Sequence, residues 1–328
     1  MARKEKSRVK RRRMGCLTGC LARLLTLLGL AALLFVASCV FGIVSNDPAG
    51  RPSLSLQDMP LADVGEWVKN AVPKEAPKGL RLPEWAYSLQ AEGLTLKMLR
   101  AGKGEALLVC SDGYTMLVGG GSGKYGPALQ MLLCGVNRLD AAVALSSAAE
   151  EISGLSLACQ IGHPGYLFYQ NTQTANTTYN ALLKTAESMQ RIVPHPGLSF
   201  TLGRAQVTFL GPVYTHHRDE RDDGLSLRID YGGTSFLILG GITAAGEQEL
   251  IAEKAALDTD VLVCAQGGGE EATCPELIRA VTPEIALCSG AASWQVKARL
   301  EKEGAAVYSM QQHGVVTVRS DGLGLTVR

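Results

Sequence analysis

The sequence lacks the short motifs that would assign a chemistry directly. It contains no G-x-S-x-G segment and no internal repeat, and its histidines number only five. The first absence excludes the nucleophile elbow of α/β-hydrolases, and the second excludes a repeat architecture. Six cysteines are scattered over residues 93–328 without C-x-x-C spacing. We therefore interpret them as small buried hydrophobes.

Two weak candidates for a ligand site remain after these exclusions. The glycine-rich stretch 119–126, GGGSGKYG, fails the spacing of a phosphate-binding P-loop. We interpret it as a loop between a hairpin and a helix, and anion binding by its backbone amides is the alternative. His216 and His217 lie in a charged loop and are interpreted as solvated surface, with a metal site shared with Asp222 or Asp223 as the alternative.

Charge is distributed unevenly along the chain. The formal net charge is only +1, but residues 1–23 contain nine of the 32 basic residues and one of the 31 acidic ones. The rest of the chain holds 23 basic and 30 acidic residues, a net charge of −7. An acidic body repels phosphate backbones, so nucleic acid is an unlikely partner for it.

The basic N-terminal segment precedes a run that predicts a membrane anchor. Residues 24–44 form a 21-residue stretch without charge, which is long enough to cross a bilayer as a helix. The arginines at 11–13 favour a cytoplasmic N-terminus, so we expect a single-pass membrane protein with its main domain extracellular. A lipoprotein signal is the alternative, because Val36–Cys39 resembles a lipobox with Cys39 as the lipidated residue.

The remaining sequence divides into a stalk and one large domain. Residues 45–92 are rich in proline, which excludes long regular elements and predicts a stalk. Residues 93–328 alternate between strand-like and helix-like segments in two halves of similar size. This pattern predicts an α/β (α+β) fold with two packed sheets and helices outside. Asp112-Gly113 predicts a hairpin turn between strands 106–110 and 115–118.

The junction at residues 144–155, ALSSAAEEISGL, has the frame of a metal site without its ligands. A strand is predicted at 139–145 and a helix at 150–160, and a hydrolase would need imidazoles and carboxylates between them. Serine and alanine occupy these positions instead. Ser147 and Glu150 have the spacing of a helix capping box, and Thr273 and Glu276 repeat it.

Taken in order, the motifs of 93–328 resemble a metallo-β-lactamase-fold domain, and most of all the soluble hydrolase domain of ComEC-type DNA-uptake proteins. The family's L-D-V-G-Q-G-D is similar to LRAGKGE at 99–105, and its D-A-G-G turn to VGGG at 118–121. Its T-H-P-H-A-D-H-I-G-G-L is similar to LSSAAEEISGL at 145–155. Its L-L-T-G-D and D-V-L-K-V-G-H-H-G-S are similar to LILGG at 237–241 and DVLVCAQGGG at 260–269. The resemblance implies a four-layer αβ/βα sandwich.

The same resemblance implies that every family metal ligand is replaced. The histidines of H-x-H fall on Ser146 and Ala148, and the D-H pair falls on Glu150 and Glu151. The bridging aspartate falls on Gly241, the late histidine pair on Gln266 and Gly267, and the aspartate of the early turn on Gly119. We therefore expect no catalytic residues, no cofactor and no zinc. The expected vestigial cleft consists of Ser146, Ser147, Ala148, Glu150, Glu151, Gly241, Gln266 and Gly267.

These inferences predict a membrane-tethered extracellular pseudo-hydrolase that serves as a binding or assembly module. Its partners would be the membrane, through residues 24–44, and an unknown protein or small ligand at the vestigial cleft. The alternative is a diverged metal-dependent hydrolase of the phosphodiesterase or nuclease type, using divalent ions through Glu105, Glu150 and Glu151.

Overall fold

The computed structural model describes residues 92–172 and 174–328. The predicted anchor at 24–44, the basic segment 1–23 and nearly all of the predicted stalk lie outside the described residues. Within the described ranges, no helix is both long and apolar enough to cross a membrane.

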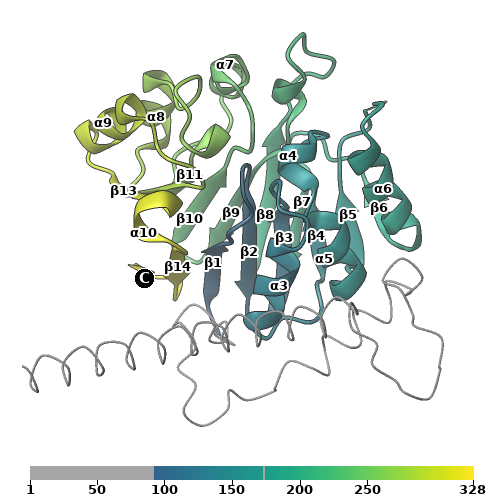
Figure 1. The fold of residues 1–328 in the computed structure, drawn as a ribbon. Coiled ribbons are helices and arrows are strands. Elements are labelled where there is room, and N and C mark those ends of the chain that lie inside the picture. Colours follow the sequence, from purple (N-terminus) through teal and green to yellow (C-terminus); the bar gives the residue numbers. More distant parts are fainter. Residues whose placement is uncertain (1–91, 173) are drawn as a thin grey trace, which may run out of the picture. The chain divides into compact units, whose positions relative to one another are not determined.

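Two mixed sheets form the centre of the described domain (Figure 1). The first sheet has eight strands in the order β15-β14-β1-β2-β3-β4-β5-β6, and the second has seven in the order β13-β12-β11-β10-β9-β8-β7. The strands of the first sheet are β1 (Leu94–Met98), β2 (Ala106–Ser111), β3 (Tyr114–Gly119), β4 (Ala141–Val143), β5 (Tyr166–Phe168), β6 (Gln190–Ile192), β14 (Thr317–Ser320) and β15 (Leu325–Val327). Those of the second are β7 (Ser199–Leu202), β8 (Ala205–Gly211), β9 (Ser226–Tyr231), β10 (Thr234–Ile238), β11 (Val261–Val263), β12 (Ile285–Cys288) and β13 (Ala306–Ser309).

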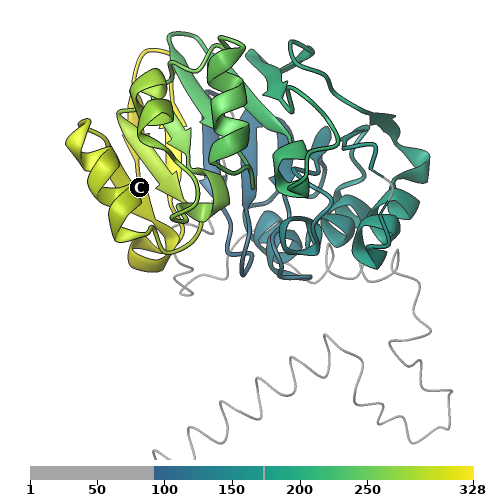
Figure 2. The same ribbon diagram turned by 90° about the horizontal axis from the view of Figure 1, so that it is seen from above.

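Helices cover the outer faces of the two sheets, as Figure 2 shows from above. Beside the first sheet lie α3 (Gly126–Leu133), α4 (Ala149–Ile152), α5 (Leu155–Gly162) and α6 (Thr177–Thr185). Beside the second lie α7 (Ala244–Ala252), α8 (Pro275–Val281) and α9 (Trp294–Lys302), and α10 (Met310–His313) follows β13. The predicted arrangement of two packed sheets with helices outside is therefore confirmed for the described residues.

Strand sequences follow from burial on both faces. Along β2, Leu107 and Val109 point to the core between the sheets, whereas Leu108 points to the core under the helices. All three are fully buried. A strand buried on both faces needs a continuous apolar run instead of alternation, which explains the segment ALLVCS. The first core also contains a stack of Phe168 on Phe200, with ring centroids 4.6 Å apart.

The predicted turn at Asp112-Gly113 is confirmed. Both residues have positive φ, and the strands on either side pair antiparallel, with Ser111 opposite Tyr114. Asp112 has a further role that the sequence did not indicate. Its carboxylate accepts hydrogen bonds from the Arg204 side chain at 2.7 and 3.0 Å and from the Tyr231 hydroxyl at 3.0 Å. These contacts tie the β2–β3 hairpin of the first sheet to the second sheet.

The predicted helix over 150–160 is wrong as one element. It is divided into α4 and α5 at Ser153 and Gly154. A Cβ atom on Gly154 would lie 2.6 Å from the Gly120 carbonyl oxygen and 2.6 Å from the Pro127 ring. The close approach of the glycine loop and α3 therefore sets this break. The strands β5, β6 and β7, which have three or four residues each, were not predicted.

Candidate functional site

A pocket of about 560 Å³ opens where loops from both sheets meet. It lies at the carboxyl ends of the parallel strands β4, β11 and β12, which is a common position for ligand sites in α/β sheets. Its lining includes all eight residues of the predicted vestigial cleft: Ser146, Ser147, Ala148, Glu150, Glu151, Gly241, Gln266 and Gly267. The structure thus brings the predicted set together in one cavity.

The glycine loop 119–123 holds the wall that carries the glutamates. The Gly120 and Gly121 amides donate to the Glu151 carbonyl at 2.6 and 3.0 Å, and the Gly121 amide also donates to the Glu105 carbonyl at 2.9 Å. A Cβ atom at Gly120 would lie 2.5 Å from the Leu155 nitrogen. Both amides are already hydrogen-bonded to backbone carbonyl groups. The loop therefore joins two segments of the wall, and anion binding by these amides loses its support.

The capping-box prediction at the start of α4 is wrong. The N-cap residue is Ala148, and no side chain caps this helix. Ser147 instead presents its carbonyl to the Asn176 side-chain amide at 2.8 Å, and the Ser146 hydroxyl accepts from the Ala148 amide at 3.1 Å. Asn176 also accepts from the Thr178 amide at 2.9 Å and so caps α6. Because Asn176 anchors this wall, the serine loop is fixed from outside the helix that it precedes.

The second predicted capping box is also wrong, for a similar reason. Helix α8 begins after Cys274, its N-cap residue, whose side chain makes no capping hydrogen bond. Thr273 has a positive φ and is buried. The carboxylate of Glu247, which comes from α7, accepts hydrogen bonds from the Thr273 and Cys274 amides. A buried acid from a neighbouring helix therefore satisfies this helix start.

Two carboxyl groups meet at the inner end of the pocket. Glu151 Oε2 accepts from the Glu105 amide at 3.2 Å, and its other oxygen approaches Gly241. Glu105 is only 1% exposed. Burial, followed by the charge of Glu151, raises the pKa of Glu105 well above its ordinary value. Burial also raises the pKa of Glu151, and the nearby Glu150 adds to the shift.

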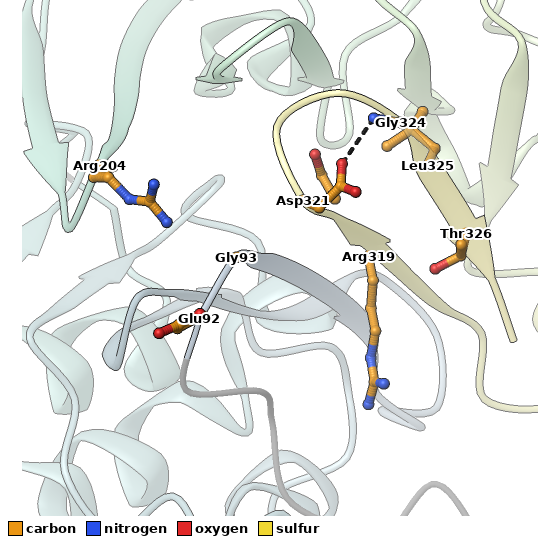
Figure 3. Close-up of a pocket in the computed structure, with 9 residues that line it drawn as sticks. Glu92, Gly93, Arg204, Arg319, Asp321, Gly324, Leu325 and Thr326 are labelled. Atoms are coloured by element: carbon orange, nitrogen blue, oxygen red, sulfur yellow. Dashed lines mark hydrogen bonds between the residues drawn. The ribbon is translucent and has the colours of Figure 1, made fainter.

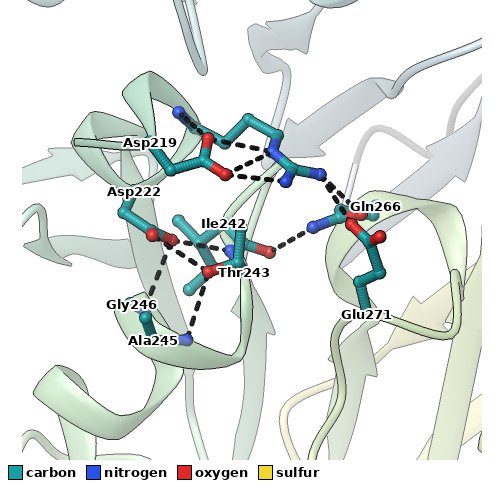
Figure 4. Close-up of polar contacts among 9 residues, drawn as sticks. Asp219, Asp222, Ile242, Thr243, Ala245, Gly246, Gln266 and Glu271 are labelled. Carbon is teal, nitrogen blue, oxygen red and sulfur yellow. Dashed lines mark hydrogen bonds and ion pairs between the residues drawn. The ribbon is translucent and has the colours of Figure 1, made fainter. Parts of the chain in front are cut away.

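The opposite wall is held by a network around Arg221 (Figure 4). Its guanidinium forms ion pairs with Asp219 at 2.7 Å and with Glu271 at 3.1 Å, and it donates to Gln266 at 3.4 Å. Gln266, at a family histidine position, donates to the Ile242 carbonyl at 3.2 Å. Its side chain is thereby engaged in holding the second sheet's loops to the 219–223 segment.

A metal centre of the kind implied by the fold does not fit these residues. Zinc needs imidazole, thiolate or carboxylate groups that converge on one point. The positions that the resemblance assigns to metal ligands carry serine, alanine, glycine, glutamine and two glutamates, and one oxygen of Glu151 is turned to a backbone amide. Across residues 92–172 and 174–328, no group of three or more His, Cys, Asp or Glu side chains could hold a metal ion.

The histidine loop carries an ion-pair cluster in place of the alternative metal site. His217 Nδ1 contacts Asp223 at 2.7 Å, and Nε2 contacts Glu249 on α7 at 2.9 Å. Burial opposes the charged imidazole, but the hydrogen bonds to Asp223 and Glu249 outweigh it, and the pKa of His217 is raised. His216 does not join this cluster. The expectation of two solvated histidines is therefore wrong for His217, whose side chain is 15% exposed.

A second hollow lies near the start of the described chain (Figure 3). Its lining includes Glu92, Arg204, Arg319 and Asp321. The two arginine side chains lie on opposite sides of Gly93 in Figure 3, and the Arg204 guanidinium is bound by Asp112. The two guanidinium groups do not converge on a shared point, so we assign this hollow no function.

The fold has clear counterparts among solved structures, although neither a protein-family model nor a curated protein matches the sequence. A CmlA β-hydroxylase mutant shares 12% identity with a TM-score of 0.51, over 84% of this chain and 65% of that one. The metallo-β-lactamase fold protein YhfI from Bacillus subtilis shares 16% identity with a TM-score of 0.44, over 65% of this chain and 95% of that one. Tm1679, a metal-dependent hydrolase of the β-lactamase superfamily, shares 10% with a TM-score of 0.46, over 66% of this chain and 95% of that one.

Two of these neighbours are named as a metallo-β-lactamase fold protein and a β-lactamase-superfamily hydrolase, and the CmlA match, with its TM-score of 0.51, shares the fold of this chain. The likeness defines architecture alone, because identities of this size carry no activity or ligand. The closer resemblance to ComEC-type domains stays a prediction.

Two residues of the pocket region, Asn176 and Arg221, were not singled out from the sequence, and Glu105 was named only as a possible ligand of a divalent ion. Asn176 anchors the serine loop, Arg221 holds the opposite wall, and Glu105 lies buried behind Glu151. The N-cap spacing of Asn176 before the helix 177–185 is a signal that could have located the first. Nothing in the sequence around Arg221 or Glu105 distinguishes either from a solvated charge.

Proposed function

We propose that the pocket is the ligand site of a non-catalytic binding module built on the metallo-β-lactamase fold. The proposal rests on one observation: all eight residues of the predicted cleft line a single cavity of about 560 Å³. A cavity of roughly 300–1,000 Å³ with a few polar groups is typical of small-molecule sites. In this proposal the cleft keeps its place in the fold, but its residues do not offer the donors that would activate a water.

In the same proposal, residues 24–44 tether this module to the cell membrane and the domain faces the exterior. The support is the sequence alone, namely the uncharged 21-residue run after a basic cluster. Such a module would present its pocket to an extracellular small ligand or protein segment. Protease accessibility of the domain in intact cells tests the orientation, and protection of the domain from added protease contradicts it.

The binding proposal is tested by a ligand screen against the purified full-length chain. Ligand-observed NMR with a library of amines, carboxylates, phosphates and sugars should give hits that share one site. Ala148, which is exposed and lines the pocket, offers a blocking variant, because Ala148→Trp fills the cavity without disturbing the core. The matched control is Ala252→Trp on α7, which is also exposed and lies outside the pocket lining.

Loss of every hit in Ala148→Trp, but not in Ala252→Trp, supports the proposal. Zinc analysis of metal-supplemented and desalted protein should find no stoichiometric metal. The proposal is wrong if the wild type hydrolyses bis-p-nitrophenyl phosphate with zinc or manganese and Glu151→Gln abolishes that turnover.

A further inference from the structure

Beside the pocket lies a buried acid that lacks a hydrogen-bond partner. Glu105 is 1% exposed, and neither of its carboxyl oxygens forms a hydrogen bond. Buried polar groups in folded proteins are almost always paired, because an unpaired one gives up its hydration without compensation. A carboxyl group in this state has no partner from the protein, so a bound ligand is a candidate partner.

The carboxyl group of Glu105 faces residues that form the pocket wall. The titratable group that acts on it most is Glu151, and the Gly267 backbone amide is near enough to favour its charged form without meeting the geometry of a hydrogen bond. Both of these residues line the pocket. Glu151 crosses the inner end, with Oε2 on the Glu105 amide and Oε1 3.5 Å from the position of a Cβ atom on Gly241. Glu105 does not itself line the pocket, but it adjoins Glu151 and Gly267, which do.

Charge around the cavity is predominantly negative. The lining contains the acids Glu150, Glu151, Asp219 and Glu220 and the bases Lys103 and Arg221. Arg221 is neutralised by its ion pairs with Asp219 and Glu271. The remaining charges of the lining are then the acids Glu150, Glu151 and Glu220 against the single base Lys103. Ser146 and Ser147, which are buried beside the glutamates, add hydroxyl oxygens that can accept hydrogen bonds.

From this arrangement we infer that the pocket binds an organic cation with a primary ammonium group, which lies against Glu151 with the charge of Glu105 directly behind it. The inference rests on the proposed function and names its ligand class. An ammonium group has three N–H donors and no acceptor. It therefore matches a wall that offers carboxylate and hydroxyl oxygens, whereas a metal ion would need a third charged ligand that the described residues do not bring there.

Binding of such a cation is coupled to protons. The groups that face the pair are Glu150 on α4 and the thiols of Cys264 and Cys288 at the ends of β11 and β12. No side-chain cation is among them. Burial raises the pKa of both Glu105 and Glu151, which favours a proton on the empty pair, and a bound ammonium group favours release of that proton. Affinity should therefore rise with pH, by up to about tenfold per unit while the pair is protonated.

The experiment is isothermal titration calorimetry of the purified full-length chain with n-butylammonium and, separately, with Nα-acetyl-lysine amide. Titrations at pH 6 and pH 8, in two buffers of different ionisation enthalpy, give the affinity and the number of protons released. We expect at least tenfold tighter binding at pH 8 and release of up to one proton per ligand. Binding of n-butylammonium alone assigns the site to free amines, and binding of both compounds extends it to lysine side chains.

Three variants test whether Glu105 and Glu151 determine the amine affinity and its pH dependence. Glu151→Gln should lower affinity at least tenfold, and Glu105→Gln should remove most of the pH dependence. Glu187→Gln removes one charge from an exposed position outside the pocket and should leave both unchanged. If Glu105→Gln does not fold, the proton release of the wild type still tests the coupling.

The inference is overturned if neither amine binds while other compounds in the library bind and are displaced by Ala148→Trp. In that case the pocket remains a binding site and only its ligand class is wrong. Absence of any displaceable ligand contradicts the proposed function itself. Stoichiometric binding of zinc or calcium that Glu151→Gln abolishes would replace the organic cation with a metal ion.

Discussion

Two buried glutamates, Glu247 in α7 and Glu105 beside the pocket, show how differently one residue type can be used. Both side chains are almost completely buried, at 0% and 1% exposure. Glu247 accepts hydrogen bonds from the Thr273 and Cys274 amides, whereas the carboxyl oxygens of Glu105 accept none. Glu247 therefore completes a helix start, and Glu105 is left for something outside the fold. The comparison separates a buried acid that stabilises the fold from one that we propose acts in ligand binding.

The largest effect in this comparison should come from Glu247→Ala. The substitution leaves two buried backbone amides without partners and removes the cap of α8. Each lost partner costs about 1–3 kcal/mol, so we expect a destabilisation of about 3 kcal/mol. Urea unfolding of the full-length chain measures it, with the exposed Glu187→Ala as control. A loss no larger than that of the control would remove the distinction between the two acids.

Glu105→Gln, unlike Glu247→Ala, should stabilise the folded protein at neutral pH. The amide keeps the size of the side chain and removes the cost of burying a charge, so we expect a gain of about 1 kcal/mol at pH 8. The pKa of Glu105 is raised in the folded state, so its contribution is fully present below the unfolded pKa of about 4.5 and is lost as pH rises. Stability of the wild type should therefore fall between pH 5 and pH 8, and that of the variant should fall less. Equal slopes for the two proteins contradict the assignment.

At His217, in contrast to both glutamates, two acidic side chains form ion pairs with an imidazole of the same chain. Its contacts with Asp223 and Glu249 raise the pKa of the imidazole. This contribution is fully present below the unfolded pKa of about 6.5 and is lost as pH rises through the folded value. We expect His217→Gln to cost about 0.5 kcal/mol at pH 6 and less at pH 8.5. Unfolding curves at the two pH values measure this, and a cost that grows with pH would reverse the assignment.

The smallest effect is expected for Glu150→Gln. Glu150 lines the pocket but is exposed, so its charge is solvated. The substitution should change stability by less than about 0.5 kcal/mol. Parallel unfolding of Glu150→Gln and Glu105→Gln therefore separates a surface acid from a buried one in the same site. A large effect at Glu150 would show that exposure is a poor guide here.

Much of the fold could be predicted because it depends on local signals. The strands β2, β3 and β4 and the Asp112-Gly113 turn agree with the segments predicted at 106–110, 115–118 and 139–145. The eight predicted cleft positions all line one pocket. Strands such as β5 and β6 were missed because three residues give no period and their order is set by the neighbouring strands.

The capping boxes failed because the pattern ignores partners from distant segments. At α4, the serine loop is held by Asn176, and at α8, Glu247 takes the place that Thr273 was expected to fill. The burial of Glu105 was equally out of reach, because LRAGKGE has the composition of a solvated loop. Whether such a charge is solvated depends on the packing of Gly121 and Gly267, which comes from segments far away in the sequence.

The position of β14 has a consequence for how the domain is made. β1 pairs on one side with β2, only a few residues later, and on the other side with β14, more than 200 residues downstream. During synthesis β1 has an unpaired edge until Thr317–Ser320 leave the ribosome, and a chain that ends before Thr317 keeps it. The buried residues Leu94, Leu96 and Met98 would then lie on an open strand, so premature stop products of this protein should aggregate.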